Sequence, residues 1–302
     1  MSQGHPDRKP RRFPLQLDQV GAGRAAGPRA AGAGPRPALP ARDVLRPQAH
    51  LHVLEQDRRR LTGPQPQGLG LDSVHVRRRM VERLMADGIS HQQVLEAFST
   101  VPRHLFVDTA LVNQAYEDTS LPIGLGQTIS KPSVVAAMLQ LLCVRPGLQA
   151  AAGLGAPPPS RHPLGNCLEI GTGCGYQAAL LGHLARCVVS IERLRDLHVK
   201  ARTNLDRLRA SHPDTPAVRL VFGDGMIGHG PHAPYDTIIA AAGGSAVPQA
   251  WIDQLAPGGR LVAPTQEGAG QVLTILDRLP NGSLQYSRAG AVLFVPLKSG
   301  TT

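Results

Sequence analysis

Aromatic residues, cysteines and long apolar runs are all scarce in this sequence of 302 residues. Phe, Trp and Tyr make up 3% of it, and the four cysteines include no Cys-x-x-Cys pair. A chain of this length needs no disulfide framework, so we expect reduced thiols and a cytoplasmic protein. No apolar run approaches the ~18 residues of a membrane helix. Residues 1–19 hold five basic residues and lack the apolar segment of a secretory signal.

The positive charge is concentrated near the amino terminus. The net charge is +10, and residues 1–70 account for +7 of it, with twelve Lys or Arg against five Asp or Glu. Residues 71–302 are close to balanced at +3. The charge therefore bears on solubility and non-specific association more than on chemistry.

Residues 1–70 are rich in Pro, Gly, Ala and Arg and show no helical or strand period. Such a segment cannot bury enough apolar surface to offset the entropy of ordering, so we predict a disordered extension. A basic arm for nucleic acid is the alternative, but no aromatics are interleaved for base stacking. An organelle transit peptide is a further alternative, which the scarcity of Ser disfavours.

Residues 71–302 carry the patterns of one folded domain, with 42% hydrophobic residues in the whole chain to supply a core. Its first part predicts three helices, at 74–85, 90–99 and 134–142. Gly88 is a stop signal for the first, and Ser90 is a candidate N-cap for the second. A Gly, Ala and Pro-rich run at about 147–163 predicts a flexible surface insertion.

From residue 166 onward, short apolar runs alternate with helical patterns. This alternation predicts an α/β fold with a doubly wound parallel sheet. The turn residues Asn281-Gly282 between two apolar runs predict an antiparallel edge hairpin at the carboxyl end. The expected strands are 167–170, 187–191, 218–222, 235–239 and 259–263, with hairpin strands at 272–279 and 292–295.

Acidic residues and glycines stand where these strands end. Glu169 precedes the loop Gly171-Thr-Gly-Cys-Gly175, Glu192 closes the second strand, and Asp224 follows the third. Ligands of open α/β sheets bind at this edge, so the set predicts a site for an adenosine ligand. Each piece alone is weak, and Glu192 as an ordinary solvated strand end is an equal alternative. The spacing G-x-G-x-G, instead of the dinucleotide G-x-G-x-x-G, favours S-adenosylmethionine over NAD.

A loop at 120–132 gathers Gly, Pro, Thr and Ser just before a predicted helix. One interpretation makes Ser130 the N-cap of that helix, with Pro132 in its first turn. The other places the hydroxyls of Thr128 and Ser130 over the cofactor pocket. The residues alone do not separate the two.

Eight motifs together resemble the protein-L-isoaspartate O-methyltransferase family, in order and spacing, over about residues 73–298. The loop Gly-Gln-Thr-Ile-Ser-Lys-Pro at 126–132 is the most specific of them, whereas the glycine loop and Pro-Gly-Gly occur in many methyltransferases. The motifs lie at 101–107, 116–118, 126–132, 168–177, 223–225, 234–239, 255–262 and 294–297. The extension 1–70 and the insertion fall outside the family pattern.

The resemblance implies a Rossmann-like methyltransferase that repairs damaged proteins. It implies methyl transfer from S-adenosylmethionine to the α-carboxyl of L-isoaspartyl residues (EC 2.1.1.77), with Ser130 as the active-site residue and no metal. The expected partners are isoaspartyl proteins and peptides, not nucleic acid or a membrane, and the expected state is a monomer. The implied cofactor contacts are Gln127, Thr128, Ile129, Ser130, Glu169, Gly171, Gly173, Gly175, Glu192, Arg193, Asp224 and Gly225.

Two other functions are compatible with parts of the sequence. A methyltransferase of nucleic acid or a small molecule would keep the cofactor residues, but it has no reason to carry the 126–132 loop. The chain also lacks the Asn/Asp-Pro-Pro-Tyr/Phe motif of enzymes that methylate base amino groups. A binding module without activity would not need Ser130, Glu169, Glu192 and Asp224 intact.

Overall fold

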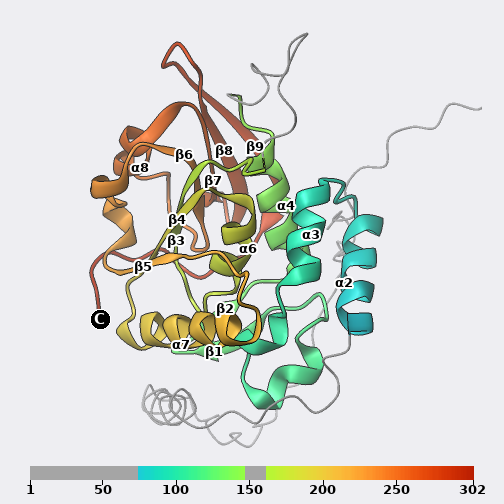
Figure 1. The fold of residues 1–302 in the computed structure, drawn as a ribbon. Helices are drawn as coiled ribbons and strands as arrows, with labels where there is room; N and C mark the ends of the chain where they lie inside the picture. Colours follow the sequence, from blue (N-terminus) through green and yellow to red (C-terminus); the bar gives the residue numbers. More distant parts are fainter. Residues whose placement is uncertain (1–73, 147–160) are drawn as a thin grey trace, which may run out of the picture.

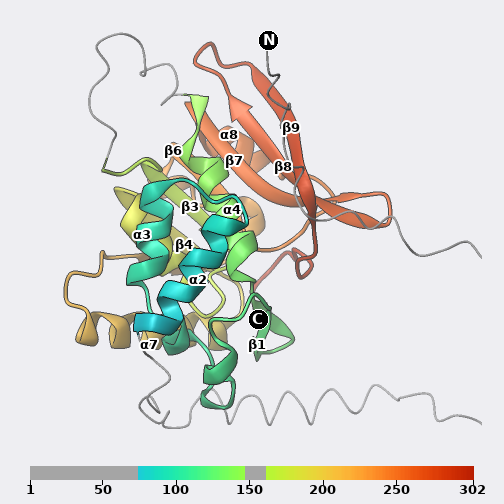
Figure 2. The same cartoon turned by 90° about the vertical axis from the view of Figure 1, so that its right-hand side faces the viewer.

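The computed structural model describes residues 74–146 and 161–302. The predicted disordered extension 1–70 and most of the predicted insertion, at 147–160, lie outside these residues. The described residues form an α/β fold in which helices cover a central sheet, as Figures 1 and 2 show. This confirms the fold class.

A seven-stranded sheet runs through the domain in the order β5-β4-β3-β6-β7-β8-β9. β3 to β7 pair in parallel, and β8 and β9 pair antiparallel at one edge. The predicted parallel sheet with a carboxyl-terminal edge hairpin is therefore confirmed. The strands are β3 (Asn166–Ile170), β4 (Cys187–Glu192), β5 (Arg219–Phe222), β6 (Tyr235–Ala240), β7 (Leu255–Glu267), β8 (Gly270–Arg278) and β9 (Leu284–Val292).

The helices lie on both faces of the sheet. One core joins one sheet face to α2, α3, α4, α6 and α7, and a second core joins the other face to α8. A small antiparallel hairpin, β1 (Leu121–Gly124) with β2 (Gln127–Ile129), precedes α4. The helices are α2 (Val74–Ala86), α3 (Gln92–Thr100), α4 (Pro132–Cys143), α6 (Tyr176–Leu184), α7 (Arg195–Ser211) and α8 (Gln249–Gln254). The short 3-10 turns are η1 (Arg103–Phe106), η2 (Thr109–Gln114), η3 (Gly225–Ile227) and η4 (Gly230–His232).

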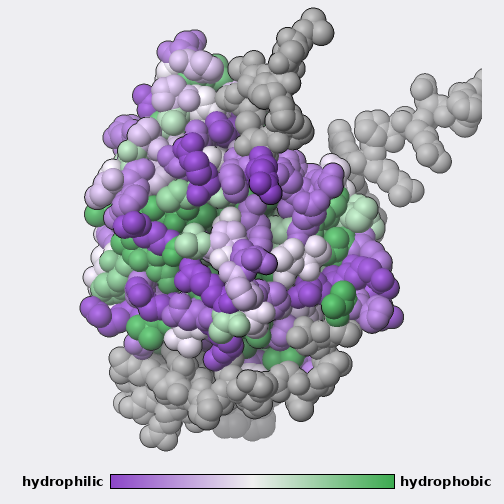
Figure 3. Space-filling model, in the orientation of Figure 1, coloured by the Kyte–Doolittle hydropathy of each residue, from purple (hydrophilic) through white to green (hydrophobic). Residues whose placement is uncertain are grey.

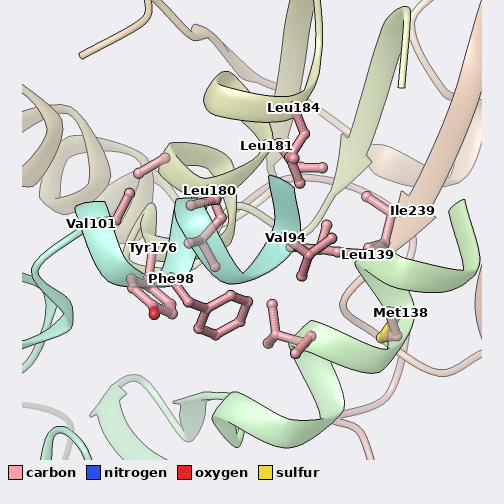
Figure 4. Packing of buried hydrophobic residues seen from close by; sticks show 14 of the residues in the cluster. Val94, Phe98, Val101, Met138, Leu139, Tyr176, Leu180, Leu181, Leu184 and Ile239 are labelled. Carbon is pink, nitrogen blue, oxygen red and sulfur yellow. The ribbon is translucent and has the colours of Figure 1, made fainter. Parts of the chain in front are cut away.

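The larger core fixes the beginning of α6. Phe98 of α3 packs edge-on against Tyr176, the first residue of α6, with ring centroids 6.2 Å apart, and Phe106 packs on the same ring at 5.5 Å. All three side chains are buried, and Figure 4 shows Phe98 and Tyr176 among the aliphatic residues of α3, α4 and α6. The loop that leads into α6 is therefore anchored to a well-packed element.

Ser90 is not the N-cap of α3, so that prediction is wrong. The helix begins at Gln92, and its N-cap His91 makes no side-chain capping bond. The backbone N–H groups of Ser90 and His91 instead donate to Oε1 of Gln140 on α4, at 2.7 and 2.9 Å. A side chain distant in sequence thus accepts the N–H groups of the two residues that precede the helix.

The second strand of the edge hairpin was also placed wrongly. The prediction put it at 292–295, but β9 ends at residue 292 and its side chains are mostly exposed. An exposed edge strand needs no apolar alternation, which is why its sequence carried no strand signal.

No helix in the described part of the chain is long and apolar enough to cross a membrane. On the face that Figure 3 shows, hydrophilic side chains are interspersed with smaller hydrophobic areas.

Candidate active site

A cavity of about 450 Å³ opens at the carboxyl edge of the parallel strands. It lies where β3 has β4 on one side and β6 on the other, which is the switch point at which α/β folds bind ligands. Its walls come from the loops after β3, β4 and β5, from the β1–β2 hairpin and from residues 295–298. The cavity therefore joins the two regions that the sequence singled out.

The glycine loop turns sharply between β3 and α6. Gly171, Gly173 and Gly175 have φ values of 90°, 57° and 91°, which L side chains rarely adopt. A Cβ atom on Gly173 would lie 3.1 Å from Cδ1 of Ile123 in β1. The loop backbone is thus in close contact with the β1–β2 hairpin. Gly171 and Gly173 line the cavity, whereas Gly175 lies behind it as the N-cap of α6.

Glu192 ends β4, and its side chain lines the cavity while remaining 5% exposed. Its Oε2 accepts the N–H of Gly173 at 2.8 Å, and its Oε1 accepts the N–H of Leu194 at 2.9 Å. Burial raises the pKa of this carboxyl, and the backbone hydrogen bonds act against that rise. Each oxygen keeps further acceptor capacity, so the carboxylate is held in place and can still receive ligand hydroxyls.

Glu169 lies beneath the glycine loop and does not line the cavity. Its side chain is completely buried, and Ser190 Oγ donates to its Oε2. Ser190 Oγ is also 2.5 Å from Oγ1 of Thr172 in the loop. Burial raises the pKa of Glu169 to about 8. The structure thus places this residue as a support of the loop from below.

Gly225 lines the cavity, and Asp224 beside it does not. A Cβ on Gly225 would lie 2.6 Å from Cγ2 of Ile170, so only glycine fits there without displacing its neighbour. The Asp224 carboxylate accepts the Met226 N–H at 2.8 Å, the Gly300 N–H at 2.7 Å and the Ser299 hydroxyl at 3.0 Å. Desolvation opposes ionisation, but these hydrogen bonds lower the pKa of Asp224. The carboxylate therefore holds the 299–300 segment against the loop after β5.

The β1–β2 hairpin and the residue that follows it also line the cavity. Gln127, Thr128, Ile129 and Ser130 all line the cavity. Arg193, which follows Glu192, lines it as well.

Ser130 is not the N-cap of α4, so that interpretation is wrong. The N-cap is Lys131, which makes no side-chain capping bond. The Asp118 carboxylate caps the helix instead, because it accepts the N–H of Ser133 at 2.9 Å and the Ser133 hydroxyl at 2.8 Å. The Ser130 side chain is therefore not needed to cap the helix, and it lies at the cavity wall.

Two parts of this site were missed in the sequence. Residues 295–298 line the cavity although the sequence placed residue 295 in an edge strand, and Lys298 among them was given no contact. Arg103 is completely buried and donates to the Ser130 carbonyl. A signal was present, since Arg103 and His104 stand among apolar residues in the motif at 101–107. Within residues 74–146 and 161–302, no group of three or more His, Cys, Asp or Glu side chains could hold a metal ion.

Comparison with known proteins gives one consistent result. The model of the family "Protein-L-isoaspartate(D-aspartate) O-methyltransferase" matches residues 75–156 and 161–302. A protein-L-isoaspartate O-methyltransferase of Methylibium petroleiphilum is 57% identical over 293 residues, which are 96% of each chain. Its counterpart in Leptothrix cholodnii is 56% identical over 89% of this chain and 85% of its own.

Solved structures agree on the fold. A protein-L-isoaspartate O-methyltransferase superimposes with a TM-score of 0.60 at 26% identity, over 74% of this chain and 66% of that one. A putative one from Plasmodium falciparum, in complex with S-adenosyl-L-homocysteine, gives 0.58 at 24% identity, over 74% and 98%. With the family match over most of the chain and the curated identities above 50%, this chain belongs to the protein-L-isoaspartate O-methyltransferase family.

Proposed function

We propose that the chain transfers a methyl group from S-adenosylmethionine to the α-carboxyl of L-isoaspartyl residues in damaged proteins and peptides. One observation carries the proposal. A single cavity is lined by the glycine loop, by Glu192 and by Ser130. The methyl donor and the carboxylate that receives the methyl group would therefore share one cavity. The relatives' common name and the S-adenosyl-L-homocysteine of the Plasmodium protein support it.

The residues present fit S-adenosylmethionine. A volume of about 450 Å³ is in the range of small-molecule sites. Glu192 would accept the ribose hydroxyls, and Gly171, Gly173 and Gly225 let the backbone approach the ligand closely. Asp224 would act through the position of Gly225, because its carboxylate is taken by Ser299 and Gly300. When bound, the cofactor supplies a methyl group on a positively charged sulfur.

Ser130 would orient the substrate carboxylate. A carboxylate with a pKa near ~4 is ionised at pH 7, so it needs no general base to become a nucleophile. Among the described residues the hydrogen bond to Ser130 goes to its carbonyl and none goes to its hydroxyl, so no activating base is in place and the hydroxyl can donate to the carboxylate. Catalysis would then come from positioning and from partial removal of water around two opposite charges. The methyl ester would cyclise to a succinimide unaided, and hydrolysis would return some normal aspartate.

A labelled-methyl transfer assay on two peptides that differ only in one isoaspartyl or aspartyl residue tests this function. We expect label in the isoaspartyl peptide alone, in a base-labile ester. Label in both peptides, or in added RNA but in neither peptide, would contradict the proposal.

We also propose that residues 71–302 make up the complete methyltransferase domain, working as a cytoplasmic monomer. The family match begins at residue 75 and supports this division. A chain that starts at Leu71 should keep its turnover on the isoaspartyl peptide and elute as a monomer in size-exclusion chromatography. Loss of soluble expression on this truncation would show that residues 1–70 are needed by the domain.

A further inference from the structure

Arg103 is a buried cation next to the proposed substrate wall. It lies in η1 with 0% of its side chain exposed. Its Nε donates to the Ala115 carbonyl at 2.8 Å, and its Nη2 donates to the Ser130 carbonyl at 2.7 Å. Its Nη1 is buried without a hydrogen-bond partner among the described residues. One side chain therefore links the chain before the β1–β2 hairpin to the residue directly after it.

No carboxylate in the described part of the chain lies within ion-pair distance of this guanidinium. Burying a charge without a counterion is costly, and mutual attraction within an ion pair is the usual compensation. Here two carbonyl oxygens and an aromatic ring compensate the charge in place of a carboxylate. The ring is that of Tyr176, whose centroid lies 4.8 Å from Cζ of Arg103. A purely structural tie between two carbonyls would not require a permanent positive charge.

The charge lies close to the cavity on two sides. Tyr176, whose ring it faces, lines the cavity, and so does Ser130, whose carbonyl it holds. Arg103 itself does not line the cavity, but it contacts two residues that do. The electrostatic attraction that a buried charge exerts on an anion is stronger than that of the same charge in water. The positive potential favours an anion beside Ser130.

On the basis of the proposed function, we propose that Arg103 is a positioning residue for methyl transfer. It fixes the backbone of Ser130, so that the hydroxyl stays directed at the substrate carboxylate. Its charge, which has no carboxylate at ion-pair distance among the described residues, favours the binding of that carboxylate in its ionised form. Arg103 touches neither ligand and acts through Ser130 and Tyr176.

The test compares Arg103→Met, Arg103→Lys and a matched control, Arg278→Met. Arg278 on β8 donates to the Leu255 carbonyl at 2.8 Å and does not line the cavity, so its variant also loses a guanidinium–carbonyl bond. For each variant, kcat and KM are measured with the isoaspartyl peptide, the Kd for S-adenosyl-L-homocysteine by calorimetry, and Tm by scanning calorimetry.

We expect Arg103→Met to lower kcat/KM for the peptide at least tenfold, while the Kd for S-adenosyl-L-homocysteine stays within twofold. Arg103→Lys keeps the charge and should recover part of the loss. Arg278→Met should leave kcat, KM and Kd unchanged per folded molecule. A merely structural role would lower Tm without this separation of peptide turnover from cofactor binding.

The inference is overturned if Arg103→Met turns over normally, or if it loses cofactor binding as strongly as turnover. Failure of both Arg103 variants to fold would assign the residue to stability alone and would overturn it too. If the unmodified chain transfers no methyl group to the isoaspartyl peptide, the proposed function itself fails. An active unmodified chain with an insensitive Arg103 refutes this inference only.

Discussion

Replacing Ser130 by Ala removes the hydroxyl that we assign to the substrate carboxylate. Because the Asp118 carboxylate accepts the N–H and the hydroxyl of Ser133 at the start of α4, the Ser130 hydroxyl contributes little to the helix. We therefore expect the free energy of unfolding to change by less than about 0.5 kcal/mol. Losing one or two oriented hydrogen bonds of roughly 1.4–4 kcal/mol in the transition state should lower turnover by about ten- to a thousandfold.

Ser133→Ala is the matched control, three residues along the same chain segment. It removes the 2.8 Å hydrogen bond from the Ser133 hydroxyl to Asp118. This exposed bond should contribute roughly 0.5–1.5 kcal/mol to stability, and its loss should not alter turnover per folded molecule. Ser133→Ala is thus expected to lower stability, and Ser130→Ala to lower turnover.

The assay combines urea denaturation with single-turnover methyl transfer at saturating S-adenosylmethionine, on the same preparations. Calorimetry with S-adenosyl-L-homocysteine should show nearly unchanged binding in both variants. A normal rate in Ser130→Ala together with a clear loss of stability would refute the catalytic assignment. An equal loss of rate in both variants would show that the segment as a whole, not the hydroxyl, matters.

Three further predictions concern the charged groups around the cavity. Glu192→Ala should weaken S-adenosyl-L-homocysteine binding at least tenfold in calorimetry, because the ribose hydroxyls lose a charged acceptor worth about 1.5–3 kcal/mol per hydrogen bond. Unchanged affinity would refute the role of Glu192 in binding the ribose. Burial raises the pKa of Glu169 from 4.5 to about 8, so between these values the folded state holds a proton that the unfolded state has released. The stability that Glu169 contributes is thus fully present below pH 4.5, falls as pH rises, and is lost above about pH 8. Calorimetric Tm values from pH 5 to 9 should fall less steeply for Glu169→Gln than for the unmodified chain, and parallel curves would contradict the assignment. Lys200 donates to Asp108 at 3.0 Å and to the Ile123 carbonyl of β1 at 2.9 Å. Lys200→Met should therefore speed amide hydrogen exchange in the β1–β2 hairpin and raise KM for the peptide. Exchange as slow as in the unmodified chain would show that the hairpin does not depend on Lys200.

The sequence by itself predicted the sheet and part of the cavity at its carboxyl edge. Strand and helix periods, together with Gly171, Gly173 and Gly175, predicted a parallel sheet with a sharp loop after its first strand. In such a sheet the carboxyl ends of neighbouring strands meet at one edge, so Glu192 and Gly225 could be placed beside the loop without coordinates. These features are local, or follow from topology alone.

The tertiary structure decided which partner each polar group takes. Gln140 replaces Ser90 at the start of α3, Asp118 replaces Ser130 at α4, and Asp224 is occupied by Gly300. Those partners are 50, 15 and 76 residues apart in the chain. Local sequence patterns favour the nearest hydrogen-bonding side chain, whereas folding brings together donors and acceptors that are far apart in the chain.

Arg103 shows that local sequence also does not predict whether a charged side chain is buried. Its motif places a charged residue among apolar ones, but the motif does not indicate that the guanidinium is buried against Tyr176 and the Ser130 carbonyl. Burial of a charge depends on all the groups that surround it, and here they come from η1, the residue after η2, the end of the β1–β2 hairpin and α6. The sequence thus predicted part of the cavity lining, whereas the packing of distant segments placed Glu169, Gly175 and Asp224 outside it and decided what lies behind Ser130.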